Sequence, residues 1–120
     1  MGRLFDAVSA LIGVCGRNTF HSQAPMELEA KAQAAADETG FYPVSIREDE
    51  GGVLRVRAAD MFPAIIADLD RGAPAPVTAA RFHNSVARMI LEAVRRIRDG
   101  SGIETAALSG GVFALSLIHI

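Results

Sequence analysis

TAARFHNSVARMILEAVRRIR, the stretch from residue 78 to residue 98, predicts the longest helix of the chain and sets its fold class. Apolar residues recur along it at the spacing of one helix face, and Thr78 is expected to cap the N-terminus. That face comprises Phe82, Val86, Met89, Ile90, Ala93 and Ile97. The opposite side carries Arg81, Arg88, Arg95 and Arg98. We interpret this arginine run as a solvated face.

Upstream of this helix, the sequence predicts a shorter helix and a hairpin. Apolar residues at helical spacing run from Met61 to Leu69, and Gly72 with the proline-containing spacer of residues 73–76 ends that helix. Before it, residues 42–46 and 53–56 are typical of two short strands around an acidic, glycine-containing turn. Pro43 cannot donate a backbone hydrogen bond, which favours an edge position.

The N-terminal part predicts two more helices. Leu4 to Ile12 carries apolar residues at helical spacing, and Gly13 supplies a stop. A second, alanine-rich helix is expected to begin with Ser22 as its cap and to run to Gly40. Glu27, near the expected start of that helix, would complement the positive end of the helix dipole, as would Glu29.

Beyond the long helix, residues 103–108 predict a buried strand, and Ser109-Gly110-Gly111 follows before a second apolar run. The chain is therefore expected to be α/β and mostly helical, with a short hairpin and one buried strand. Three predicted strands are too few for a complete sheet of an α/β fold. A core that packs against a sheet absent from this sequence would leave apolar surface exposed.

Composition restricts the classes of function. The chain has 120 residues, is 50% hydrophobic and 22% charged, and fits one globular domain. Its formal net charge of -2 gives no general attraction to nucleic acid or to anionic membrane. Cys15 is the only cysteine, so no internal disulfide is possible, and a reducing, cytoplasmic location is expected.

Neither apolar end predicts a membrane segment. Asp6 interrupts the first apolar run, which also lacks a signal-peptide cleavage site, and it stands where an N-myristoylation motif needs Ser or Thr. The run from Thr105 to Ile120 is shorter than the roughly 20 apolar residues of a membrane-spanning helix. We expect both ends to be buried elements.

Several residues could carry chemistry. Gly110 and Gly111 would form a strand-to-helix turn that either brings backbone N–H groups to a nucleotide or has a purely structural role. Asp6 either faces solvent or holds a polar group. His83 with Asn84 either lines a cleft or is structural. His21, His83 and His119 lack the paired spacing of metal ligands, so no metal site is expected within the chain.

Four blocks, taken in order, resemble one family. They are GRLFDAV at residues 2–8, QAPMELE at 23–29, ARFHN at 80–84 and ALSGGVF at 107–113. Together they are similar to the C-terminal catalytic region of the hydrogenase maturation carbamoyltransferases of the HypF family. The resemblance extends over about residues 2 to 114, so residues 1–114 are expected to form a partial carbamoyltransferase domain.

The resemblance implies a partial actin-like and sugar-kinase-like (ASKHA-type) lobe. Enzymes of this family use ATP and carbamoyl phosphate to form carbamoyl adenylate, and they pass the carbamoyl group to the C-terminal cysteine of the partner HypE. This step belongs to [NiFe] hydrogenase maturation. The chain is accordingly expected to be an inactive fragment of a parent enzyme.

The resemblance also assigns residues. Asp6 and Glu27 match carboxylates that hold the ribose hydroxyls, and Gly110 and Gly111 match the loop that approaches the nucleotide; no catalytic residue is assigned. The divalent metal of the parent would have its ligands outside the chain, in a histidine motif before Gly2 and an aspartate after Ile120.

Two departures from the family pattern accompany these matches. Leu115 replaces an expected Asn, so residues 115–120 are expected to be a non-native tail, and Ser22 stands where relatives tend to have Gly.

Two alternatives remain open at this point. The chain could be a stand-alone small protein-interaction module whose apolar stripe docks a partner. It could also be a piece of a tRNA threonylcarbamoyladenosine transferase, although that family favours Phe-Asp-Lys where this chain has Phe5-Asp6-Ala7.

Overall fold

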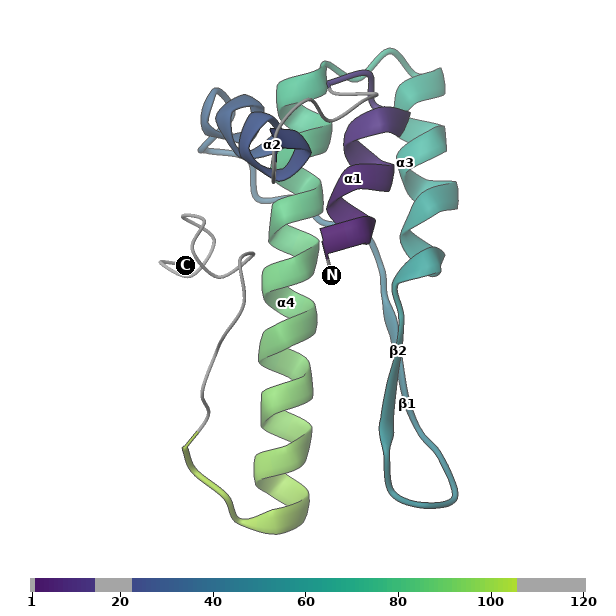
Figure 1. Ribbon diagram of the computed structural model, residues 1–120, viewed down its shortest axis with the longest axis vertical. Helices are drawn as coiled ribbons and strands as arrows, with labels where there is room; N and C mark the ends of the chain where they lie inside the picture. The colour runs from purple at the N-terminus through teal and green to yellow at the C-terminus, as the bar shows by residue number, and fades with distance from the viewer. Residues whose placement is uncertain (1, 15–22, 106–120) are drawn as a thin grey trace.

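The computed structural model describes residues 2–14 and 23–105, which form four α-helices, a short 3-10 turn and one antiparallel hairpin that extends beside the last helix (Figure 1). In order, the elements are α1 (Gly2–Leu11), α2 (Gln23–Gln33), β1 (Ser45–Glu48), β2 (Leu54–Arg57), the 3-10 turn η1 (Ala58–Asp60), α3 (Met61–Asp70) and α4 (Ala75–Ser101). The predicted order of helices and hairpin is confirmed over these ranges. The chain has a mostly helical α/β fold.

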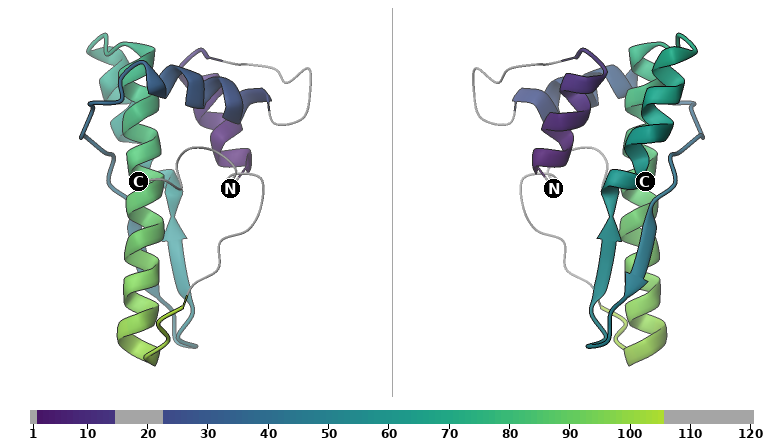
Figure 2. Two further views of the ribbon diagram at one scale, coloured as in Figure 1. Left: turned by 90° about the vertical axis from the view of Figure 1, so that its left-hand side faces the viewer. Right: turned by 90° about the vertical axis from the view of Figure 1, so that its right-hand side faces the viewer.

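Helix α4 is the axis of the molecule. Its 27 residues, at 1.5 Å of rise each, give a length of about 40 Å, close to the longest dimension of 42 Å. Helices α1, α2 and α3 surround its first half, and we call these helices together with residues 75–88 the head. The second half runs alongside the hairpin, and we call residues 89–101 with β1 and β2 the arm (Figures 1 and 2).

The hydrophobic core lies in the head. Phe5 of α1 meets Phe82 of α4 edge to face, with 4.9 Å between the ring centroids. Around them are buried Val8, Ile12, Leu28, Ala32, Tyr42, Met61, Ile65, Ala79, Ala80 and Val86. The predicted apolar face of α4 is thus buried at Phe82 and Val86, whereas Ile97 in the arm is 50% exposed. The same helical pattern therefore has two different environments.

The N-terminus of α4 differs from the prediction. The helix begins at Ala75, Pro74 is its N-cap in an extended conformation, and Pro76 lies in the first turn. Proline suits these positions because its φ is preset and its missing N–H would have no helical partner. Thr78 lies inside the helix and is buried, and its hydroxyl donates to the Ala75 carbonyl at 3.1 Å. The prediction that Thr78 caps the helix is wrong.

The connection between α2 and β1 also differs from the prediction. Helix α2 ends at Gln33, well before Gly40, and β1 begins at Ser45, so Pro43 precedes the strand. Side chains of α4 hold this connection in place. Asn84 donates to the carbonyls of Glu38 and Gly40, both at 2.9 Å. Ser85 accepts the backbone N–H of Tyr42 at 2.6 Å, so that group is satisfied outside any strand.

The hairpin pairs β1 with β2 in antiparallel register, from Ser45 opposite Arg57 to Glu48 opposite Leu54. Its turn is organised by Asp49, whose carboxylate accepts the backbone N–H groups of Gly51 and Val53 at 2.9 and 3.0 Å. Arg96 of α4 donates to the carbonyl of Ile46 at 3.0 Å. This bond attaches the hairpin to the second half of α4.

The predicted strand at residues 103–108 is wrong for the part that is described. Helix α4 ends at Ser101, and Gly102 caps it with a φ of 74° and a backbone N–H that donates to the Arg98 carbonyl. Residues 103–105 after it are exposed and belong to no strand, and Ile103 is 59% exposed. Residues 106–108 and the predicted tail lie outside the described residues. Over the described ranges, no helix is both long and apolar enough to cross a membrane.

Candidate functional site

Asp6 and Glu27, the two predicted ribose ligands, are on neighbouring helices of the head. Asp6 follows the buried Phe5 in α1, and Glu27 precedes the buried Leu28 in α2. Each side chain points away from its buried neighbour, at the border of the packed helix face, and both are half-buried. Their backbone positions are thus fixed by packing while their carboxylates remain accessible.

The two carboxylates differ in their partners. The Gln23 side chain donates to Glu27 Oε1 at 3.0 Å, which leaves the other oxygen of Glu27 outside that bond. Asp6 has no hydrogen-bond or ion-pair partner within residues 2–14 and 23–105. Glu27 is the fifth residue of α2, beyond the first turn where the helix dipole acts, so the structure does not support its dipole role. Gly110 and Gly111 lie outside the described residues.

His83 is buried against the aromatic core. Its ring centroid is 5.7 Å from that of Phe5 and 6.0 Å from that of Phe82. Burial lowers the pKa of His83, and the charge of Glu29 opposes this shift only in part. Nε2 has no hydrogen-bond partner among the residues that the structure describes. His83 is thus a neutral core residue with one unsatisfied nitrogen, and Asn84 is structural because it binds the connection after α2.

An ion-pair network in the head was missed by the sequence analysis. Asp68 of α3 is buried and accepts hydrogen bonds from Tyr42 Oη at 2.7 Å and from Arg81 Nη1 at 2.8 Å. Arg71 also pairs with it. Arg81 contacts Glu38 as well, at 3.2 Å. The interpretation of Arg81 as part of a solvated face is therefore wrong.

The network changes the acidity of its members. Burial acts to raise the pKa of Asp68, but hydrogen bonds from Tyr42 and Arg81 and the charges of Arg81 and Arg71 outweigh it and leave this pKa below its usual value. Burial and the neighbouring Asp68 raise the pKa of Tyr42. Asp68 is therefore an anion at neutral pH and Tyr42 a neutral donor. A signal was present in the sequence, since Asp68 continues the helical spacing of Met61 and Ile65 on the apolar face of α3.

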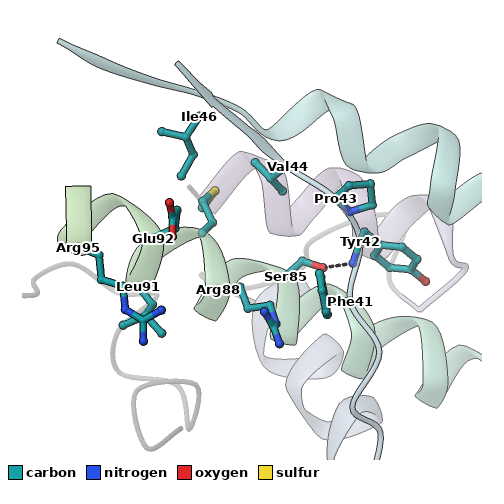
Figure 3. Close-up of a pocket in the computed structure, with 11 residues that line it drawn as sticks. Phe41, Tyr42, Pro43, Val44, Ile46, Ser85, Arg88, Leu91, Glu92 and Arg95 are labelled. Carbon is teal, nitrogen blue, oxygen red and sulfur yellow. Dashed lines mark hydrogen bonds between the residues drawn. The ribbon is translucent and has the colours of Figure 1, made fainter. Parts of the chain in front are cut away.

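A groove of about 350 Å³ lies between residues 41–46 and the α4 residues from Ser85 to Arg95 (Figure 3). It is not lined by Asp6, Glu27, His83 or Asn84. The Arg88 guanidinium lies over the Phe41 ring, 3.9 Å from its centroid, a cation–π contact. The groove is therefore a second surface, separate from the predicted nucleotide ligands.

The described residues contain no group of three or more His, Cys, Asp or Glu side chains that could hold a metal ion. The head does present accessible carboxylates, which are suitable acceptors for the hydroxyls of a ribose. The chemistry that these residues themselves can perform is therefore binding and orientation.

The fold and its motifs define a class of protein. Residues 1–119 match the family model described as "Carbamoyltransferase, Kae1-like Domain, second subdomain", and the chain belongs to this carbamoyltransferase family. Within it, the chain is similar to proteins named HypF. It is 36% identical over 115 residues to Carbamoyltransferase HypF of Synechocystis sp., and the aligned stretch covers 94% of this chain and 14% of that protein. It is 32% identical over 118 residues to the HypF homolog of Cupriavidus necator, and this alignment covers 93% of this chain and 29% of that protein.

Solved structures agree with this assignment. The crystal structure of full-length HypF in the phosphate- and nucleotide-bound form matches with a TM-score of 0.89 and 34% identity, over 98% of this chain and 18% of that one. The T. kodakarensis HypF structure matches with a TM-score of 0.77 and 28% identity, over 99% of this chain and 15% of that one. The predicted resemblance to HypF is confirmed, and the chain spans less than a third of these relatives.

Proposed function

We propose that the chain serves as the second subdomain of a Kae1-like domain in an ATP-dependent carbamoyltransferase. The parent would form carbamoyl adenylate from carbamoyl phosphate and transfer the carbamoyl group to the C-terminal cysteine of HypE during [NiFe] hydrogenase maturation. The match of residues 1–119 to the family carries this proposal. The ASKHA-type lobe and the cytoplasmic location belong to the same proposal, as does the assignment of residues 1–114 to the domain and of residues 115–120 to a non-native tail.

In this proposal the head binds the nucleoside. Asp6 and Glu27 accept hydrogen bonds from the ribose hydroxyls, and the exposure of both side chains supports this role. Gly110 and Gly111 let the backbone approach the nucleotide closely, since glycine has no side chain in the way. Carbamoyl phosphate would release its phosphate to water to give carbamate, and bound ATP would supply the adenylyl group to a carbamate oxygen with pyrophosphate as the leaving group. The divalent metal has its ligands in other parts of the parent, and no step here depends on it.

The ribose contacts are tested by comparing ATP with its 3′-deoxy and 2′-deoxy analogues. The host is a full-length carbamoyltransferase in which this chain forms the second subdomain. Loss of a hydrogen bond to a charged group costs about 1.5–3 kcal/mol, so Asp6→Ala, which removes the acceptor altogether, should raise the KM for ATP roughly tenfold or more. The variant should also lose most of its preference for ATP over one deoxy analogue.

Asp70→Ala, an exposed substitution at the end of α3, is the matched control and should leave this preference intact. Unchanged discrimination in both Asp6→Ala and Glu27→Ala would refute the ribose assignment. The 120-residue chain alone is expected to be inactive, and carbamoyl adenylate formed by it alone would contradict that expectation.

A stand-alone interaction module is the second candidate, and the exposed apolar residues of the arm favour it. Leu91 and Ile97 are 48% and 50% exposed. This alternative predicts a monodisperse chain that unfolds cooperatively and has no affinity for nucleotide. The subdomain proposal predicts a poorly soluble or loosely packed chain when it is isolated.

A further inference from the structure

The groove between residues 41–46 and α4 has a charge pattern that the described residues leave unbalanced. Arg88 and Arg95 line it two helical turns apart, and neither has an ion-pair partner within residues 2–14 and 23–105. Several other arginines of the described chain do have one, such as Arg81 with Asp68 and Arg55 with Asp49, whereas Arg3 and Arg47 have none but lie outside the groove. The groove therefore presents two cations without counter-charges.

The acidic residue of the groove does not balance these arginines. Glu92 also lines the groove, but Arg96 donates to its carboxylate at 3.0 Å. Since Glu92 already has a cationic partner, Arg88 and Arg95 determine the net charge of this surface. A ligand that fits must supply negative charge.

The walls between the two arginines are apolar. Leu91 is 48% exposed and Phe41 is 47% exposed, and both line the groove. Figure 3 shows the side chains of Arg88, Leu91 and Arg95 along α4, with Phe41 and Pro43 on the connecting segment. Seven residues of helix separate the arginines by about 10 Å along the axis, which equals about three residues of extended chain. Side chains on one face of an extended chain recur every second residue. An extended peptide with two carboxylates four residues apart, about 13 Å and within reach of the long arginine side chains, therefore presents both of them and a central apolar side chain to the groove.

We propose that this groove is the docking site for an acidic, extended segment from the remainder of a full-length carbamoyltransferase of this family. The chain corresponds to 18% of the full-length HypF structure and to a domain described as a second subdomain, so relatives contain much additional chain that could supply such a segment. A segment of the same polypeptide benefits from a high effective concentration, so that a small site is enough to hold it. A second copy of this arm is a poor occupant because its own groove presents the same positive charges.

The proposal depends on family membership and not on the ribose assignment, because the groove contains neither Asp6 nor Glu27. It is tested with fluorescein-labelled 20-residue peptides that tile the part of Synechocystis HypF outside the matched stretch. Circular dichroism first establishes conditions in which the 120-residue chain is folded and soluble, and fluorescence anisotropy then measures peptide binding to it at low and at moderate salt. We expect binding only by peptides with two carboxylates flanking an apolar residue, and weaker binding at higher salt.

The double variant Arg88→Glu/Arg95→Glu should lower the affinity of the bound peptide at least tenfold. Arg98→Glu is the matched control, since Arg98 is on the same helix, pairs with Asp99 and does not line the groove. It should change the affinity less than twofold. A peptide with its two carboxylates replaced by lysine should bind the double variant better than it binds the unsubstituted 120-residue chain. Such a gain of binding would show that the double variant is folded and that charge determines the affinity.

Three results would overturn the proposal. One is the absence of any binding peptide at millimolar concentration, and another is an equal loss of affinity in the Arg98→Glu control. The third is self-association of the chain that the Arg88→Glu/Arg95→Glu variant abolishes, which would identify a second copy as the occupant. The nucleotide affinity of the full-length enzyme is measured in a separate experiment. A failure of the peptide-binding test therefore does not affect the assignment of the ribose ligands.

Discussion

At the scale of single residues, Asp68 connects α3 to α4 and to the segment between α2 and β1. Its carboxylate accepts from Tyr42 in the connection after α2, from Arg81 in α4 and from Arg71 at the end of α3. The side chain of Asp68 is only 3% exposed, whereas that of Arg71 is 68% exposed. The two ion pairs of Asp68 should therefore contribute very differently to stability.

Asp68→Ala should lower the free energy of unfolding by about 3 kcal/mol, because it leaves a buried tyrosine hydroxyl and a partly buried guanidinium without their acceptor. Arg71→Ala should cost less than about 1 kcal/mol, since exposed ion pairs contribute little. Urea unfolding followed by circular dichroism measures both. Equal losses in the two variants would contradict the central role of Asp68.

His83 predicts a dependence of stability on pH. Its pKa in the folded chain lies below the ordinary value of 6.5, so the unfolded chain binds the proton more readily. The contribution of His83 to stability is therefore complete above that ordinary pKa and is lost as the pH falls below it. Between pH 7.5 and pH 5.5 the free energy of unfolding should decrease, and His83→Gln should flatten this slope. An identical slope in the variant would assign the dependence to other groups.

These two residues show what sequence reasoning could and could not reach. The helical position of Arg81 opposite an apolar face predicts exposure, and only the packing of α3 against α4 reveals the buried carboxylate that it binds. The role of Asp68 could have been inferred from its place on the apolar face of α3, but two of its partners, Tyr42 and Arg81, lie outside α3 and far from Asp68 in sequence. The contact of His83 with Phe5 likewise depends on how α1 meets α4.

At the scale of elements, the ends of helices and strands were predicted less well than their existence. Alanine-rich sequence predicts that α2 continues to Gly40, yet the helix ends at Gln33. The reason is tertiary, because Asn84 and Ser85 bind the backbone of residues 38–42 in a conformation that is neither helix nor strand. In contrast, the periodicity of α1, α3 and α4 was sufficient to place them.

Asn84→Ala tests this element-scale account. The substitution removes two hydrogen bonds to backbone carbonyls and should cost about 1–2 kcal/mol. Amide hydrogen exchange should become faster in residues 38–42 while α1 and the first half of α4 remain protected. Gln33→Ala, an exposed change at the end of α2, is the control and should alter neither quantity. Uniform acceleration throughout the head would instead indicate global destabilisation.

At the scale of the whole molecule, the head is packed and the arm is largely uncovered. Exposed apolar side chains of the arm include Val53 on the hairpin turn and Leu91 and Ile97 on α4. This agrees with the expectation that the chain leaves apolar surface exposed. What covers such a surface is not predictable from these residues, because their pattern reveals an apolar face but not the chemistry of a partner.

Leu91→Lys/Ile97→Lys should reduce binding of the dye ANS to the chain severalfold. Because both side chains are about half exposed, the variant should change the free energy of unfolding by no more than about 1 kcal/mol. Fluorescence titration and urea unfolding check the two expectations. ANS binding that is unchanged by the substitutions would locate the exposed apolar surface elsewhere.

Within residues 2–14 and 23–105, the hairpin that Arg96 binds to α4 is a sheet of two strands, so the outer edges of these strands have no neighbouring strand among the described residues. Such edges can recruit strands from other molecules and start ordered aggregates. Here the exposed side chains along the hairpin are largely charged, with Arg47 and Glu48 on β1 and Arg55 and Arg57 on β2. Stacking copies of this hairpin would bring like charges together, so the charged side chains should keep the exposed arm from starting an amyloid-like fibre.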